Sequence, residues 1–133
     1  MDQAEPPPRS RILIVDDDPL VNRTMRRLLD DSYVVDVELD ANDALARITA
    51  GETFDAVLCD LMMPTLSGAE FGARLAEIAP AMRAACGFVT GGACGREAEA
   101  FVATLPRDRV LIKPFAVADL LALVERLLAT RAS

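Results

Sequence analysis

The chain has 133 residues and a formal net charge of −7, and 52% of its residues are hydrophobic. This length and composition indicate one compact globular domain, and the negative charge argues against binding to nucleic-acid phosphates. No apolar run approaches the roughly 20 residues that a membrane span needs, and the N-terminal segment contains no apolar secretory signal, so we expect a cytoplasmic protein without membrane association.

The N-terminal segment differs in composition from the rest of the chain. Residues 1–10 are polar and include three consecutive prolines, which favours a flexible tail or linker. Residues 11–130 carry alternating strand and helix patterns and are expected to form the domain, followed by a short tail at 131–133. No second domain and no internal repeat is expected.

The cysteine pattern favours reduced thiols over a disulfide framework or a zinc site. The number of cysteines is odd, their spacing is not that of a metal site, and two of them lie within apolar runs, where we expect them to be buried. The three residues are Cys59, Cys86 and Cys94.

The chain after the tail begins with a strand, a helix and a second strand. Arg11–Val15 is a short apolar run suited to a strand that is buried on both faces. Pro19 suits the first turn of a helix, because its missing N–H is not needed there, and apolar residues then recur at helical spacing to about Asp31. Val34–Glu38 is half apolar and predicts the second strand.

The middle of the chain predicts two more helices on either side of a third strand. Asp40 is a plausible N-cap for a helix that Gly51 ends. Asp55–Cys59 predicts the third strand. Ser67–Glu70 has the spacing of a capping box and predicts the start of a helix that ends before Pro80.

The last part of the chain continues the same alternation. Ala84–Val89 and Arg109–Ile112 predict the fourth and fifth strands. Helices are expected over about Cys94–Leu105 and Val117–Ala129, the second with Leu120, Leu121, Val124, Leu127 and Leu128 facing inward. Five strands that alternate with five helices indicate an α/β fold with a parallel sheet, helices on both faces and right-handed crossovers.

Polar side chains follow four of the five predicted strands. In open parallel sheets, sites form beyond the carboxyl ends of the strands, so we expect these side chains to meet at one edge. Two carboxylates about 4 Å apart repel by about 4 kcal/mol at an effective dielectric constant of about 20, so the clustered acids need cations. The residues are Asp16, Asp17 and Asp18 after the first strand, Asp60 after the third, Thr90 after the fourth and Lys113 after the fifth.

This set of side chains suits phosphoryl transfer. Lys113 supplies one positive charge, and carboxylate oxygens are ligands that suit Mg²⁺. Thr90 could donate a hydrogen bond to a phosphoryl oxygen, and Asp60 is the natural nucleophile because a carboxylate can carry a phosphoryl group as an acyl phosphate. Asp18 is interpreted instead as the cap of the helix that follows it.

Four motifs, IVDDD, LCDLMMPTLSG, FVTGG and LIKPF, occur in this order within residues 11–130. In this combination the chain resembles the receiver domain of two-component response regulators. The resemblance implies a flavodoxin-like (βα)5 three-layer sandwich with strand order 2-1-3-4-5. The TGGA turn and the KPF motif are most similar to receivers attached to hybrid histidine kinases.

The resemblance also implies partners and roles for the site residues. The partner would be a histidine kinase or a histidine phosphotransfer domain that donates a phosphoryl group from a phosphohistidine. The chain would act as a signalling phosphoacceptor that modifies only itself, as a monomer or weak dimer, with an output partner that the sequence does not identify. The implied roles are phosphoacceptor for Asp60, Mg²⁺ or Mn²⁺ ligands for Asp16, Asp17, Asp60 and the Met62 carbonyl, phosphoryl contacts for Lys113 and Thr90, and a cis peptide bond before Pro114.

Phosphorylation is expected to switch the Thr90 loop and the face formed by the fourth helix, the fifth strand and the fifth helix. The family often has an inward-swinging Tyr or Phe three residues before Lys113, where this chain has Val110, so an aromatic switch is in doubt. Met62 and Gly92 occupy the positions that tune water access to the phosphoaspartate, and neither offers a polar side chain, which predicts slow self-dephosphorylation.

Two other functions fit parts of the sequence. An apolar strand followed by Asp16-x-Asp18 also opens haloacid-dehalogenase-type phosphatases, which would turn over a phosphomonoester. Those folds need further acids near the C-terminal strand, which here ends in Lys-Pro-Phe. A pseudo-receiver that docks partners without taking phosphate would lack stabilisation by Mg²⁺.

Overall fold

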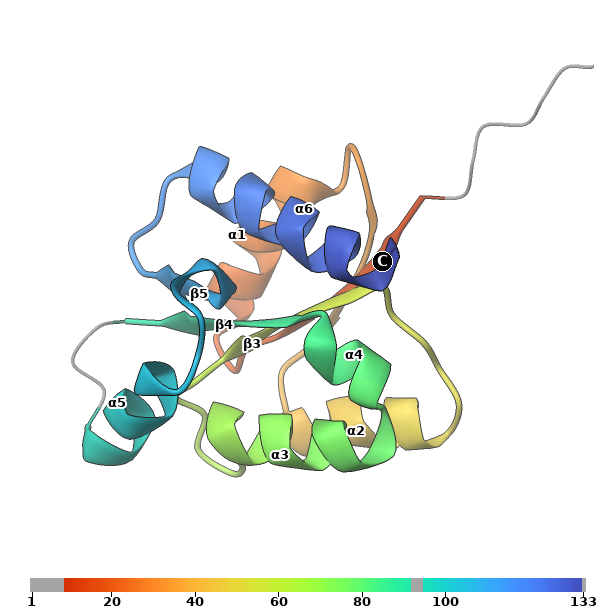
Figure 1. Ribbon diagram of the computed structural model, residues 1–133. Coiled ribbons are helices and arrows are strands. Elements are labelled where there is room, and N and C mark those ends of the chain that lie inside the picture. Colours follow the sequence, from red (N-terminus) through yellow and green to blue (C-terminus); the bar gives the residue numbers. More distant parts are fainter. Residues whose placement is uncertain (1–8, 92–94, 133) are drawn as a thin grey trace, which may run out of the picture.

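A computed structural model describes residues 9–91 and 95–132 of the chain. Five parallel strands form one sheet in the order β2-β1-β3-β4-β5, and helices cover both of its faces (Figure 1). The flavodoxin-like three-layer fold expected from the sequence is therefore confirmed. The strands are β1 (Arg11–Val15), β2 (Val34–Glu38), β3 (Ala56–Asp60), β4 (Cys86–Thr90) and β5 (Val110–Ile112).

The helices depart from the prediction at Pro80 and at the C-terminal end, where the last helix continues to Ala132, into the segment expected to be a tail. Pro80 was expected only to follow a helix, but it begins a short helix of its own, because proline is well accommodated in a first helical turn. The described part of the chain thus has six α-helices instead of five, and a 3-10 turn at Arg107–Arg109 before β5. The helices are α1 (Pro19–Leu29), α2 (Ala41–Thr49), α3 (Gly68–Ile78), α4 (Pro80–Ala84), α5 (Arg96–Ala103) and α6 (Val117–Ala132).

The sheet has a hydrophobic core on each face. In β1, Leu13 and Val15 belong to the core under α2 and α3, and Ile12 and Ile14 belong to the core under α1 and α6. Figure 1 shows α1 and α6 on one face of the sheet and α2, α3 and α5 on the other. Burial on both faces explains why this strand is apolar at each position from Ile12 to Val15 instead of at alternate positions.

The last helix packs on a slightly different face from the one predicted. Leu120, Val124 and Leu127 are fully buried as expected, and Leu123, which the sequence analysis missed, is buried with them. Leu121 and Leu128 are only partly buried against the same core. None of the described helices is long and apolar enough to cross a membrane.

Side chains near helix starts act as caps where the sequence indicated them. The Asp18 carboxylate accepts a hydrogen bond from the Leu20 N–H at 2.9 Å, and the Asp40 carboxylate accepts one from the Asn42 N–H at 2.7 Å. The capping box at the start of α3 is formed in both directions. These caps fix where α1, α2 and α3 begin.

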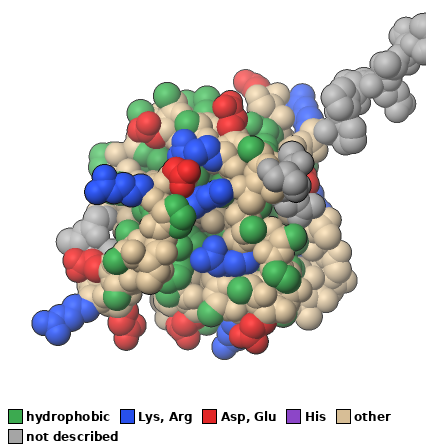
Figure 2. Space-filling view, in the orientation of Figure 1, with side chains coloured by type: hydrophobic (Ala, Val, Ile, Leu, Met, Phe, Trp, Pro, Cys, Tyr) green, Lys and Arg blue, Asp and Glu red, His purple; other side chains and the backbone are tan. Residues whose placement is uncertain are grey.

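Two of the cysteines are buried free thiols, as predicted, and Cys94 lies outside the described residues. The carboxyl ends of the strands lie at the opposite end of the sheet from the end of α6 (Figure 1). On the face shown in Figure 2, acidic and basic side chains are interspersed. The three acids discussed below lie together at the carboxyl end of the sheet.

Candidate functional site

Three acidic side chains meet at the carboxyl end of the sheet. Asp16 directly follows β1 and Asp60 is the last residue of β3, and these two strands are paired neighbours. Carboxylate oxygens of Asp16, Asp17 and Asp60 all lie within 4.8 Å of one another. Asp16 and Asp60 are only 2% and 6% exposed, whereas Asp17 is exposed to solvent. The site therefore has a buried floor and one side open to water.

Lys113 brings a positive charge to this cluster from the far edge of the sheet. Its Nζ lies 3.2 Å from Asp16 Oδ2 and 3.7 Å from Asp60 Oδ1. Its backbone N–H donates to the Thr90 carbonyl at 2.7 Å, and the peptide bond between Lys113 and Pro114 is cis. One ammonium group thus faces two buried carboxylates.

Burial and neighbouring charge make the Asp60 carboxyl difficult to ionise. The pKa of Asp60 is raised from 3.8 to about 6, chiefly by burial and then by the Asp16 carboxylate. The Lys113 ammonium and a hydrogen bond from the Met62 backbone N–H lower the pKa of Asp60, but less strongly. A further cation would favour the ionised form of the whole cluster.

Three hydrogen bonds organise the turn between β1 and α1. Asp16 Oδ1 accepts from the Asp18 N–H at 2.9 Å, and Asp18 caps the helix. Asn22, which the sequence analysis did not single out, donates from Nδ2 to the Asp16 backbone carbonyl at 2.7 Å and is only 3% exposed. The available signal was its place on the inward face of α1, one turn before the buried Met25.

A close backbone approach fixes the other side of the site. Gly68 N donates to the Leu61 carbonyl at 3.1 Å, and a Cβ on Gly68 would lie 2.7 Å from the Asp60 carbonyl oxygen. Only glycine therefore allows α3 to begin this close to the end of β3. Met62, two residues past Asp60, is 53% exposed.

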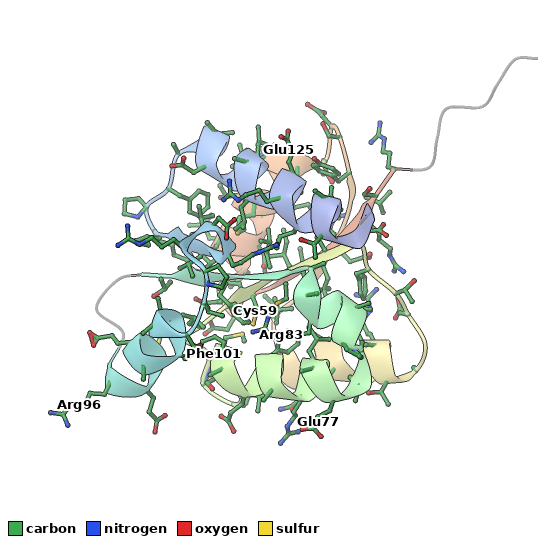
Figure 3. All side chains as sticks on the ribbon, in the orientation of Figure 1. Cys59, Glu77, Arg83, Arg96, Phe101 and Glu125 are labelled. Carbon is green, nitrogen blue, oxygen red and sulfur yellow. The ribbon has the colours of Figure 1, made fainter. Side chains whose placement is uncertain are left out.

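Thr90 ends β4 and is 4% exposed, beside the strand that carries Asp60. Two residues earlier on β4, Phe88 is paired in register with Val110 of β5. The Phe88 ring contacts Phe101 of α5 edge-on with centroids 4.9 Å apart, and Arg83 lies over it. Figure 3 shows Phe101 on α5 and Arg83 on α4, on the same side of the sheet. Gly92 lies outside the described residues.

The donor set fits a hard divalent cation. Its three carboxylates converge, and its one solvent-facing acid leaves room for the water ligands that Mg²⁺ retains. Excess negative charge beside a single ammonium group is a further reason for a cation here. Mg²⁺ or Mn²⁺ suits these ligands better than a metal that prefers thiolate or imidazole.

Comparisons with known proteins agree with this geometry. The family profile described as "Response regulator receiver domain" matches residues 12–125. Response regulator MprA of Mycolicibacterium vanbaalenii is 37% identical over 123 residues, which is 89% of this chain and 50% of that protein. Transcriptional regulatory protein TcrA of Mycobacterium tuberculosis is 33% identical over 117 residues, 84% of this chain and 43% of that protein. The chain therefore spans about half the length of the curated relatives it matches.

Solved structures show the same fold over nearly the whole chain. The receiver domain protein (CheY-like) from Methanospirillum hungatei superposes with a TM-score of 0.81 and 29% identity, over 93% of this chain and 97% of that one. Neither curated relative is named as a hybrid histidine kinase, so the narrower resemblance to hybrid-kinase receivers stays a prediction. With the profile match, the relatives and the fold in agreement, the chain belongs to the receiver-domain family of two-component response regulators.

Proposed function

We propose that this chain is a phosphoacceptor module and that Asp60 takes a phosphoryl group from a phosphohistidine on a histidine kinase or a histidine phosphotransfer domain. The observation that carries the proposal is the position of Asp60. Its carboxylate is 6% exposed at the end of β3, 3.7 Å from Lys113 Nζ and within 4.8 Å of two further acids. Buried carboxylates without matching positive charge destabilise the fold, so their presence at this strand end points to a functional role.

In the proposed reaction, a carboxylate oxygen of Asp60 forms a bond to phosphorus and the bond from phosphorus to the donor imidazole nitrogen breaks. The product is an acyl phosphate, and the imidazole keeps the electron pair of the broken bond. Lys113 and the Thr90 hydroxyl would contact phosphoryl oxygens. Asp16, Asp17, Asp60 and the Met62 carbonyl would hold Mg²⁺ or Mn²⁺, which when bound neutralises charge on the phosphoryl oxygens.

The same proposal includes an output face made of α5, β5 and α6. Thr90 is linked to this face because its carbonyl accepts a hydrogen bond from the Lys113 N–H directly after β5. On β5 the Ile112 side chain is 61% exposed, and a groove of about 270 Å³ lies beside it between β5 and α6. A change at the phosphoryl group would reach this face through the Thr90 strand end and Lys113, without an aromatic residue at Val110.

The direct test is labelling with a small phosphodonor and Mg²⁺, followed by intact mass measurement. We expect wild type to gain one phosphoryl group and Asp60→Asn to gain none. Asp31→Asn removes an exposed acid after α1 and is the matched control, which should label like wild type. Absence of an adduct on wild type would contradict the proposal, and repeated turnover of p-nitrophenyl phosphate would indicate a phosphatase instead.

A second measurement addresses the lifetime of the phosphorylated form. Met62 is 53% exposed beside Asp60 and has no polar group that could position an attacking water. We therefore expect slow self-dephosphorylation, and a faster loss of label in Met62→Asn, whose amide can hold a water. Decay of the labelled wild type as fast as that of Met62→Asn would rule out this role for the Met62 position.

A further inference from the structure

The buried amide of Asn22 has no place in the chemistry proposed above, yet it contacts the backbone of the acidic cluster. Its Nδ2 donates to the Asp16 carbonyl at 2.7 Å across six residues of chain. The side chain is 3% exposed, and the bond joins the first turns of α1 to the residue that ends the buried β1 run. A bond in this position can act on the site only through the backbone.

The accepting carbonyl belongs to the peptide unit between Asp16 and Asp17. Because a peptide unit is planar, holding its oxygen fixes the orientation of the whole unit, and with it the direction in which the chain enters Asp17. Two interactions of its own fix the Asp16 side chain: Oδ1 accepts a hydrogen bond from the Asp18 N–H, and Oδ2 faces Lys113. Among the described residues, none donates a hydrogen bond to the Asp17 carboxylate, so its placement depends on this backbone.

The energetics of Asn22 also argue against a purely structural role. Its Oδ1 is buried and has no hydrogen-bond partner in the part of the chain that the structure describes. An unsatisfied buried amide oxygen is destabilising, and the neighbouring inward positions of α1, Met25 and Leu29, are apolar. Packing alone would favour an apolar residue at this position too, whereas only a donor can hold the Asp16 carbonyl.

We propose that Asn22 is a positioning residue for the metal site: through the peptide unit between Asp16 and Asp17 it sets the Asp17 carboxylate toward Asp16 and Asp60, and so raises the affinity for Mg²⁺. The inference rests on the proposed function, since it assumes that these three acids hold the ion. Asn22 itself touches neither the ion nor the phosphoryl group.

The test compares Asn22→Leu, which keeps a similar volume and removes the donor, with Met25→Ala. Met25 is 1% exposed on the same face of α1, so its truncation weakens the helix packing without touching the turn. Mg²⁺ affinity is measured by calorimetric titration, because the chain contains no tryptophan whose fluorescence could report binding. Asn22→Ala serves as the second variant if Asn22→Leu does not fold.

We expect the Mg²⁺ dissociation constant to rise about tenfold in Asn22→Leu, which is the usual effect of losing a residue that orients a metal ligand without touching the metal. In Met25→Ala it should change less than about twofold. Labelling by the phosphodonor should need correspondingly more Mg²⁺ but reach the wild-type rate at saturation, because the ligands themselves remain.

Three results would overturn the inference: a rise of less than about threefold in Asn22→Leu, equal weakening in Met25→Ala, or a labelling rate that stays low at saturating Mg²⁺. Failure of the proposed function looks different. In that case wild type itself would bind no Mg²⁺ and take no label. A wild type that does both, together with an Asn22→Leu variant that titrates identically, would reject the inference alone.

Discussion

At the scale of single residues, burial and charge act against each other most strongly at Asp60. The pKa of this carboxyl is raised to about 6, chiefly by burial and then by the Asp16 carboxylate. A carboxyl whose pKa is higher in the folded state than in the unfolded chain binds protons more tightly when folded. Its contribution to stability is therefore complete below pH 3.8 and is lost as the pH rises through about 6.

The raised pKa of Asp60 leads to a prediction for the stability of Asp60→Asn in the metal-free protein. The amide cannot ionise, so the variant should be more stable than wild type at pH 7.5 by about 1–3 kcal/mol, the size expected for a shift of about two pKa units. The difference should shrink as the pH falls below about 6. Urea unfolding at several pH values in the presence of a chelator measures it, with Asp31→Asn as the control for loss of an exposed acid. A variant less stable than wild type at pH 7.5 would contradict the raised pKa.

Several of these residue positions could be predicted because they follow from where strands end. Asp16, Asp60 and Lys113 come from strands far apart in the sequence, and a parallel sheet brings its carboxyl ends to one edge. Their roles in phosphoryl transfer stay predictions. Asn22 was missed because a polar residue inside a helical pattern is ordinarily assigned to the solvent face, and only the turn geometry shows that it points at the Asp16 carbonyl.

At the scale of elements, the start of α3 is fixed by contact with the end of β3. A Cβ on Gly68 would lie 2.7 Å from the Asp60 carbonyl oxygen and 2.8 Å from Leu61 Cα. Both are backbone atoms at the buried end of β3, so they cannot move aside as a flexible side chain would. Any side chain at this position must displace α3 or the residues that carry Asp60.

We therefore expect Gly68→Ala to lower the free energy of unfolding by about 1–3 kcal/mol, the usual range for overpacking. Gly91→Ala is the matched control, because a Cβ on Gly91 meets nothing within 4 Å and its φ is not positive. Urea unfolding compares the two variants. Equal effects would show that the approach of α3 to β3 is not the constraint, and that any glycine near the site is equally sensitive.

The attachment of α5 shows how unevenly the elements are held. None of the residues within α5 is buried, its N-cap Gly95 supplies no side-chain cap, and Phe101 reaches the core through its edge-on contact with Phe88. We expect Phe101→Ala to increase hydrogen exchange across 96–103 much more than in α3, because few other contacts hold this helix. Uniform exchange in all helices of the variant would contradict this local effect.

Element boundaries were predictable where a cap or an apolar run marked them, and unpredictable where one residue type has two uses. β1 and β2 match the predicted ranges because the apolar residues within each strand mark its extent. α4 was missed because proline both follows helices and begins them. Thr90 and Asp60 were placed after their strands, whereas each ends its strand, because a buried polar residue at a strand end looks like the start of a loop.

At the scale of the whole molecule, the two ends of the sheet balance their charges differently. At the amino ends of the strands, Arg47 and Arg11 bind Glu52 at 2.8 and 2.9 Å and stack on the Phe54 ring. These hydrogen bonds, from Arg47 first and then Arg11, lower the pKa of Glu52 to about 2. At the carboxyl ends, by contrast, Lys113 is the one cationic side chain of the described residues that pairs with the three clustered acids.

This asymmetry was not predictable from the sequence. The second strand ends in no distinctive residue by pattern, yet its Asp36 and Glu38 pair with Arg11 and Arg47. Net charge says only that acids exceed bases in the chain as a whole. Pairing in space decides that the acids around Arg11 and Arg47 are neutralised within the protein, whereas the three clustered acids share one ammonium group, which is why we propose an ion from solution there.

That requirement couples Mg²⁺ to pH in the stability of the whole domain. A ligand that binds only the folded state stabilises it by about 2.7 kcal/mol at one hundred times its dissociation constant. Because protons compete with metal for carboxylates, the gain from Mg²⁺ should be largest near pH 7.5 and fade as the pH falls through about 6, where Asp60 becomes protonated. Mg²⁺ should therefore move the pH of maximal stability upward, since the metal-free protein loses the Asp60 contribution over the same range.

Thermal unfolding with Mg²⁺ and with a chelator, from pH 5 to 8, tests this coupling. In Asp60→Asn the Mg²⁺-dependent gain should be mostly lost and its dependence on pH flattened, because one anionic ligand and its titration are both removed. Mn²⁺ should act like Mg²⁺, as it accepts the same oxygen ligands. A gain from Mg²⁺ that is the same at pH 5 and pH 8, or that survives undiminished in Asp60→Asn, would contradict a role for the ionised Asp60 carboxylate in holding the ion.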